Sequence, residues 1–358
     1  MSRFELLFMP KLTPPPTVAP ETWRALFAAA ADFSALEPWA FARDCDVVGL
    51  IDPVTGEGRI AHVLGNAGEV FAAVIYRRAG LRWILAMLDE SPSPENLNNI
   101  EGMDCLKLEL VPKRELEKAD LAVLKAAAFK PVGKGVVWPQ FRSSEPGWHP
   151  WPIHQTEAEQ LLADLPRLTA FCQFFEKHPE LFDGRSAMEI PFLPTVLPAR
   201  PLMPQDLEWR PFLSPALVPP EPFQATAGQL EKLRALKTLP GLACEFDCTM
   251  LPGGSFIEQG RPCFGRFALL VEQRQGMVVG MSVESGASLL GEAAGRSLVD
   301  ALLKAGHLPE KIFIGGARLQ PVLQPLCAAL NIQLQTAASL PLLEEALESL
   351  GAEMLGRF

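Results

Sequence analysis

The chain has 358 residues, of which 48% are hydrophobic and 21% charged, and its formal net charge is −10. This length and composition indicate two globular domains and exclude a disordered protein. The acidic balance argues against an extended nucleic-acid surface, because non-specific affinity for phosphates comes from clustered Lys and Arg. No apolar run approaches the roughly 18 residues of a membrane span, so no membrane contact is expected.

The first 16 residues are not expected to form a signal peptide, because Glu5 and Lys11 interrupt them and a proline triplet follows. Seven cysteines without a CxxC pair fit a reducing compartment, so we expect a cytoplasmic protein. Cys244 and Cys248 share one face of a predicted strand, and with Cys263 they permit a metal site. A buried Cys behaves as a small hydrophobe, and the pattern favours that interpretation.

The first half of the chain is predicted to be an α+β domain, residues 1–184, built on an antiparallel meander. Three apolar runs separated by glycine-containing turns indicate the meander, and helical spacing marks the helices. The expected elements, in chain order, are a helix at 20–33, strands at 46–51, 59–64 and 69–76, a helix at 79–88, a loop at 91–99, a strand at 105–111, a helix at 114–129 and an edge strand at 136–142.

Residues 146–154 hold two tryptophans, three prolines, His149 and His154. Two interpretations remain open: packing on the sheet surface, or an aromatic shelf for a ligand. The support is too weak to make the two histidines ligands. The longest predicted helix follows at 156–177, with Thr156 and Glu159 spaced as a capping box.

Residues 185–228 are predicted to be a proline-rich, apolar linker. Ten prolines lie between Pro191 and Pro222, interleaved with large apolar side chains. A flexible linker would be rich in Gly and Ser, so we expect this one to lie extended and mostly buried against one or both domains. Docking of a proline-recognition partner is the alternative.

The C-terminal domain, residues 229–358, is predicted to follow the order βββαβαβα. A turn at 252–254 ends the first strand, Gln275-Gly276 closes a hairpin, and Gly306 stands where a helix C-cap belongs. The expected elements are strands at 244–251, 264–272 and 277–283, a helix at 289–305, a strand at 311–314, a helix at 321–330, a strand at 332–336 and a helix at 341–350. The whole protein is thus of the α/β and α+β classes, with a mixed sheet in this domain.

This element order, with Asp247 in the first strand, resembles the ribonuclease H-like fold of integrases and transposases. The resemblance implies acidic residues on the first strand, the fourth strand and a later helix that together hold a divalent metal. The fourth strand instead ends in Gly315-Gly316, with no carboxylate. Glu292, Glu344 and Glu345 are the available partial replacements. More broadly, the chain resembles bacterial proteins built from domains of unknown function.

Two functions follow from these observations. The favoured hypothesis is a non-catalytic binding or scaffold protein without a cofactor, whose partner is an unknown protein or small ligand and whose ribonuclease H-like domain lacks a complete metal site. The alternative is a metal-dependent nuclease or phosphoryl-transfer enzyme that uses Asp247, Glu292 and Glu344 or Glu345 with magnesium or manganese. The sequence contains no P-loop, GxSxG, HExxH or strand-linked GxGxxG motif that would indicate another activity.

Overall fold

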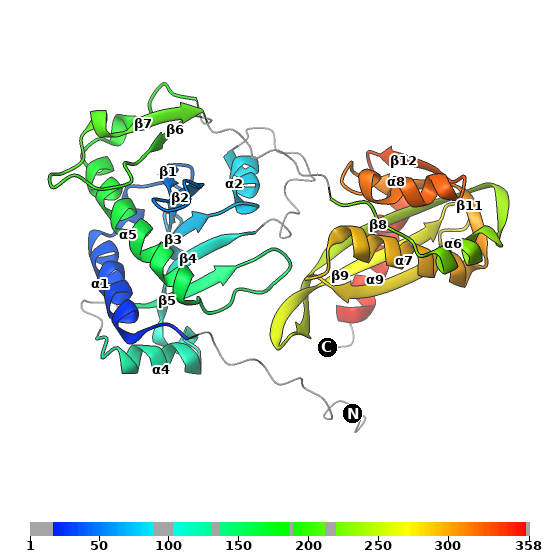
Figure 1. The fold of residues 1–358 in the computed structure, drawn as a ribbon, viewed down its shortest axis with the longest axis horizontal. Coiled ribbons are helices and arrows are strands. Elements are labelled where there is room, and N and C mark those ends of the chain that lie inside the picture. Colours follow the sequence, from blue (N-terminus) through cyan, green and yellow to red (C-terminus); the bar gives the residue numbers. More distant parts are fainter. Residues whose placement is uncertain (1–16, 89–102, 131–136, 187–188, 212–219, 356–358) are drawn as a thin grey trace. The chain divides into compact units, whose positions relative to one another are not determined.

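A computed structural model of the chain describes residues 17–88, 103–130, 137–186, 189–211 and 220–355. The predicted loop at 91–99 and the first 16 residues lie outside this range. The chain forms two compact units, Met1–Pro215 and Ala216–Phe358. Each contains one sheet with helices packed on it (Figure 1).

The first unit contains a seven-stranded sheet in the order β5-β4-β3-β2-β1-β6-β7. Neighbours from β1 to β5 are antiparallel, which confirms the predicted meander. β6 pairs parallel to β1, and β7 pairs antiparallel to β6. The strands are β1 (Val48–Ile51), β2 (Gly58–Leu64), β3 (Phe71–Tyr76), β4 (Cys105–Pro112), β5 (Val137–Ser144), β6 (Glu189–Phe192) and β7 (Glu208–Pro211).

Successive side chains of these strands point to opposite faces of the sheet, so the unit has an apolar layer on each face. Helices α1 (Pro20–Leu36) and α5 (Gln155–Phe175) pack together on one face over the larger core, to which α4 (Lys118–Ala126) also contributes (Figure 1). Helix α2 (Gly80–Leu88) covers the smaller core on the other face. Short 3₁₀ turns lie at Pro38–Ala40, Lys113–Glu115, Pro179–Phe182 and Pro204–Asp206.

Two predicted helix starts in this unit are wrong, and side-chain caps explain both. The helix expected from residue 114 begins at Lys118, because the carboxylate of Asp120 accepts a hydrogen bond from the Glu117 backbone N–H at 3.0 Å. The cap of α5 is His154 rather than Thr156. The His154 ring accepts from the Glu157 N–H at 3.4 Å, and Glu157 accepts from the His154 N–H at 3.1 Å.

Two short stretches of the proline-rich segment, 189–192 and 208–211, are strands of the first sheet. β6 and β7 add two strands beyond β1, and the first unit extends to Pro215. Among its described residues, the large apolar side chains that are buried are Ile190, Phe192, Leu193, Leu202 and Leu207. Burial of these side chains offsets the loss of donors at the prolines.

The second unit contains a five-stranded mixed sheet in the order β10-β9-β8-β11-β12. β8, β9 and β10 are antiparallel neighbours, whereas β11 runs parallel to both β8 and β12. The strands are β8 (Lys237–Glu258), β9 (Arg261–Glu272), β10 (Met277–Ser285), β11 (His307–Gly315) and β12 (Gln333–Ala337).

Helices cover both faces of this sheet (Figure 1). α6 (Ala227–Arg234), α7 (Leu290–Ala305) and α8 (Gln320–Ala329) share one core with it, and α9 (Pro341–Leu355) packs on the opposite face. Gly306 caps α7 in the left-handed conformation with φ 73°, as predicted.

The turn predicted at residues 252–254 is wrong. β8 continues through it to Glu258, and the pairing with β9 shifts register between Leu251 and Ser255. A glycine pair accommodates such an irregularity as readily as a chain reversal, so local sequence does not separate the two outcomes. Helix α6, which no prediction anticipated, begins at a capping box formed by Thr226 and Gln229.

Candidate functional site

Asp247 lies on β8, at the position that prompted the nuclease alternative. Its Oδ1 accepts hydrogen bonds from Nη2 of Arg318 at 3.0 Å and from the Cys248 backbone N–H at 2.8 Å. The same Nη2 also donates to the Cys248 carbonyl at 2.9 Å. The carboxylate is therefore paired with a guanidinium that is itself anchored to the strand.

The neighbouring strand brings a glycine against Asp247. A Cβ at Gly315 would lie 3.3 Å from Oδ2 of Asp247 and 3.3 Å from Leu340 Cδ1, which is tighter than ordinary van der Waals contact. A larger side chain at residue 315 would have to displace one of these neighbours. The close approach gives a packing reason for the absence of a carboxylate at this strand end.

The other acidic candidates lie on helices. Glu292 is exposed on α7, which packs on the sheet face opposite α9. Glu344 and Glu345 are exposed in the first turns of α9. Within the described residues, no group of three His, Cys, Asp or Glu side chains is arranged to hold a metal ion. Asp247 and these three glutamates are thus not assembled into such a group.

Glu245 is a buried carboxylate that the sequence analysis did not single out. Its Oε2 accepts from the Leu343 backbone N–H in the first turn of α9 at 3.0 Å, and its Oε1 accepts from Gln273 Nε2 at 3.1 Å. A negative charge at a helix N-terminus is favourable, so Glu245 anchors α9 to the sheet. Its position in the same strand as Asp247, two residues earlier, was the available signal.

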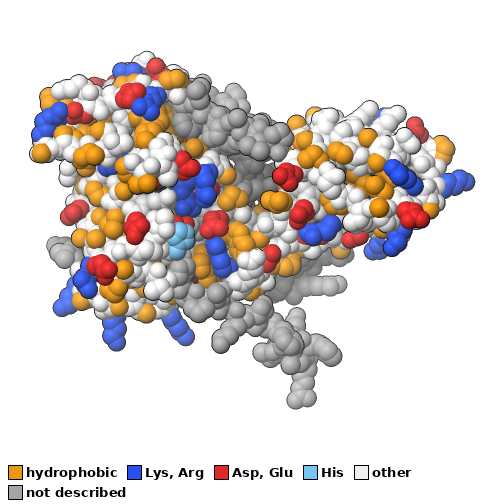
Figure 2. All heavy atoms as spheres, in the orientation of Figure 1, with side chains coloured by type: hydrophobic (Ala, Val, Ile, Leu, Met, Phe, Trp, Pro, Cys, Tyr) orange, Lys and Arg blue, Asp and Glu red, His pale blue; other side chains and the backbone are white. Residues whose placement is uncertain are grey.

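The first unit contains a cavity of about 590 Å³. We call it the α5 cavity, because residues in the first turns of α5 form part of its wall. Its lining residues are Glu57, Gly58, Arg59, Arg77, Arg78, Leu81, Glu145, His154, Thr156, Glu157 and Gln160. On the first unit, Figure 2 shows basic and acidic side chains gathered beside a histidine.

A buried network supports the wall of the α5 cavity. Arg77 donates from Nε to Asp104 Oδ1 at 3.0 Å, from Nη1 to Glu157 Oε1 at 3.0 Å and from Nη2 to Ser143 Oγ at 3.2 Å. Ser143 Oγ donates to the same Glu157 oxygen at 2.5 Å. Burial acts to raise the pKa of Glu157, but hydrogen bonds from Ser143 and His154 and the Arg77 charge outweigh it and lower that pKa.

Arg59 forms a second buried ion-pair system at the cavity. It pairs with Asp52 and with Asp164 of α5. Asp164 also accepts from Arg167 Nη1 at 3.3 Å, and that guanidinium donates to three backbone carbonyls, of Ile51, Leu193 and Pro194. These charges are compensated within the protein, so they shape the cavity more than they attract a ligand.

The Trp- and Pro-rich segment is tied to β5. Trp151 and Ser143 exchange backbone hydrogen bonds at 2.8 and 2.9 Å. Ile153 is fully buried, whereas Trp148 and Trp151 are half-buried. The cavity lining includes His154 but neither tryptophan. His154 thus belongs to a cavity that the sequence did not indicate.

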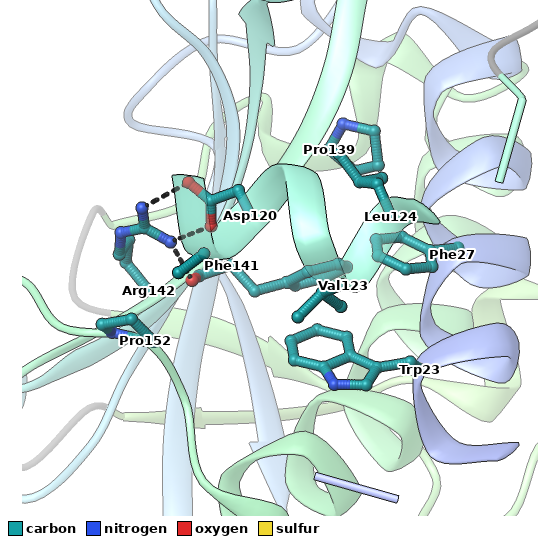
Figure 3. Close-up of a pocket in the computed structure, with 10 residues that line it drawn as sticks. Trp23, Phe27, Asp120, Val123, Leu124, Pro139, Phe141, Arg142 and Pro152 are labelled. Atoms are coloured by element: carbon teal, nitrogen blue, oxygen red, sulfur yellow. Dashed lines mark hydrogen bonds and ion pairs between the residues drawn. The ribbon is translucent and has the colours of Figure 1, made fainter. Parts of the chain in front are cut away.

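A smaller cavity lies between α1, α4 and β5 (Figure 3). It measures about 30 Å³, enough for about one water molecule. At its edge Arg142 donates to both oxygens of Asp120, at 2.8 and 2.7 Å. Burial tends to raise the pKa of Asp120, but Arg142 and Gln140 outweigh it and lower that pKa. This cavity is too small for a metabolite and is a packing feature.

Comparison with known families agrees with the division of the chain. Residues 23–191 match the family described as Domain of unknown function (DUF7309), and residues 229–351 match Domain of unknown function (DUF6930). The protein is therefore built from two uncharacterised domains, as the resemblance indicated. No curated protein matches the chain. Among the helices described, none combines the length and apolar character that crossing a membrane requires.

Proposed function

We propose that the protein is a non-catalytic binding or scaffold protein whose second unit is a ribonuclease H-like domain without a complete metal site. Three antiparallel strands followed by two parallel strands that alternate with helices support the resemblance. We also propose that the protein acts in a bacterial cytoplasm. Its seven free cysteines, all within the described residues, support a reducing compartment.

The pairing of Asp247 with Arg318 carries this proposal. A hard cation such as magnesium exchanges its waters only for several charged oxygens, which must converge from different elements. Here a guanidinium occupies one oxygen of Asp247, and the adjacent strand end offers Gly315. Arg318 supplies the positive charge that balances the Asp247 carboxylate. The unit keeps its architecture and is available as a binding module.

A nuclease assay tests the proposal. Wild type, Asp247→Asn and the control Asp300→Asn, an exposed position on α7, are incubated with single- and double-stranded DNA and RNA in magnesium or manganese. We expect no metal-dependent cleavage by any of the three. Millimolar metal should not raise the melting temperature of the wild type, since even an ion at its Kd adds only about 0.4 kcal/mol.

Cleavage by the wild type and Asp300→Asn that is lost in Asp247→Asn would overturn the proposal. That result would establish the metal-dependent enzyme, with Asp247 as a ligand. The same assay on Glu292→Gln, Glu344→Gln and Glu345→Gln would then identify the remaining ligands.

A further inference from the structure

We propose that the α5 cavity binds a small zwitterion that carries an ammonium and a carboxylate, an amino acid or a short peptide. The inference goes beyond the proposed function, because it concerns the first unit and holds whether or not the second unit is catalytic. A volume of about 590 Å³ lies within the range of small-molecule sites. Charged groups of both signs line it.

Arg78 is the donor for the ligand carboxylate. Its side chain is 65% exposed, and its Nε donates to Asp104 Oδ2 at 3.0 Å, which orients the guanidinium. A guanidinium with one edge held in this way can present its remaining N–H groups to a carboxylate.

The backbone at Arg78 is strained, with φ 36° in the left-handed region. The turn around it is clamped: the Arg77 N–H donates to the Asp104 carbonyl at 2.9 Å, and the Gly80 N–H donates to the Arg77 carbonyl at 2.7 Å. A Cβ at Gly80 would lie 2.1 Å from the Asp104 carbonyl oxygen, so only glycine fits there. Strain of this kind at a non-glycine residue on a cavity wall is typical of functional sites.

Two acceptors suit the ligand ammonium. Glu57 is an exposed carboxylate on the cavity wall. Gln160 Oε1 is buried on that wall and has no hydrogen-bond partner among the residues described. An unpaired buried acceptor is unfavourable, and an ammonium or amide N–H of a ligand would satisfy it.

The charge distribution selects a zwitterion over a simple anion. Arg77 is compensated by Asp104 and Glu157, and Arg59 is compensated by Asp52 and Asp164. The charged side chains on the wall that are at least partly exposed, Arg78, Glu57 and Glu145, carry both signs. A ligand with a single charge would meet either Arg78 or the two carboxylates unfavourably, whereas a zwitterion satisfies both signs.

Calorimetric titration of the full chain tests the inference. The probes are the twenty standard amino acids and a set of glycyl dipeptides, each at millimolar concentration. Each compound that binds is then compared with its N-acetyl and carboxamide derivatives, and inorganic phosphate serves as the simple anion. We expect at least one zwitterion to bind and each derivative, which lacks one charge, to bind about tenfold or more weakly.

Three variants connect this binding to the cavity. Arg78→Gln and Glu57→Gln should each weaken the zwitterion about tenfold or more. The control Arg114→Gln, at a side chain that is 84% exposed and outside the cavity lining, should bind as the wild type does. Circular dichroism checks that each variant is folded, and because Glu57 is exposed its variant tests the site even if Arg78→Gln does not fold.

Three results would overturn the inference. The first is no binding of any amino acid or dipeptide. The second is binding that neither Arg78→Gln nor Glu57→Gln weakens. The third is binding of phosphate and N-acetyl amino acids as tight as that of the zwitterions, which would make the cavity an anion site.

Discussion

Replacing Arg77 by Met tests the buried network behind the α5 cavity most directly. Arg77 holds Asp104 and Glu157, both nearly inaccessible to solvent, and Met keeps much of its volume without the charge. Removing one partner of a buried ion pair typically costs about 3–5 kcal/mol, because the other charge remains buried and uncompensated.

The contacts that survive place the cost of Arg77→Met at the lower end of that range. Asp104 keeps its pairing with Arg78 Nε at 3.0 Å. Glu157 keeps the hydrogen bonds from Ser143 and from the His154 backbone N–H. We therefore expect a loss of about 3 kcal/mol in the free energy of unfolding near neutral pH.

The loss in free energy of unfolding caused by Arg77→Met should become smaller as the pH falls. The folded-state pKa of Glu157 is lowered below 4.5, so its contribution is present above that value and is lost as the pH falls through the folded pKa. Without Arg77 this carboxyl protonates more readily and relieves part of the penalty. The difference between wild type and Arg77→Met should shrink as the pH is lowered toward about 4.5.

Urea denaturation followed by tryptophan fluorescence, over a series of pH values, measures this difference. Arg114→Gln is the control and should change stability by no more than about 0.5 kcal/mol, because Arg114 is exposed. A loss below about 1 kcal/mol for Arg77→Met, or one that stays constant or grows toward acid pH, would refute the reasoning.

Two further predictions concern buried titratable groups. Burial lowers the pKa of His62 below its usual value near 6.5, so the unfolded chain takes up a proton first. Stability should therefore fall as the pH drops through about 6.5. His62→Gln should flatten that decline in denaturation experiments, and an unchanged slope would contradict the prediction. Burial also raises the pKa of Cys172, Cys244 and Cys327 to about 12 each, whereas Cys45 is exposed. Iodoacetamide should therefore modify Cys45 alone in the native protein and seven thiols after denaturation, as peptide mass spectrometry would show; early labelling of another cysteine would contradict the buried positions.

Local sequence correctly predicted several elements at which periodicity and a turn residue agreed. The glycine-containing turns between β1, β2 and β3 predicted the meander, and Gln275-Gly276 predicted the hairpin of β9 and β10. Gly306 predicted the end of α7, because a left-handed cap favours glycine. The lack of a carboxylate at Gly315 was also readable directly from the sequence.

Long-range pairing decided what local patterns left open. Proline content indicated a linker, but β6 and β7 pair in the first sheet, and β6 adds Ile190 and Phe192 to its smaller core. Glycines at 253 and 254 indicated a turn, but pairing with β9 carried β8 onward. In both cases the free energy of burial and strand pairing outweighed a local preference.

At both candidate sites, the sequence supplied single residues and the tertiary structure decided which residues lie together. The sequence by itself identified Asp247 as an acidic residue of the first strand in this domain, but its partner Arg318 is 71 residues away. The α5 cavity joins side chains from β2, the turn after β3 and the start of α5, which only the folded sheet brings together. Side-chain chemistry and local spacing are properties of the sequence, whereas charge pairing and cavities depend on distances that tertiary packing sets.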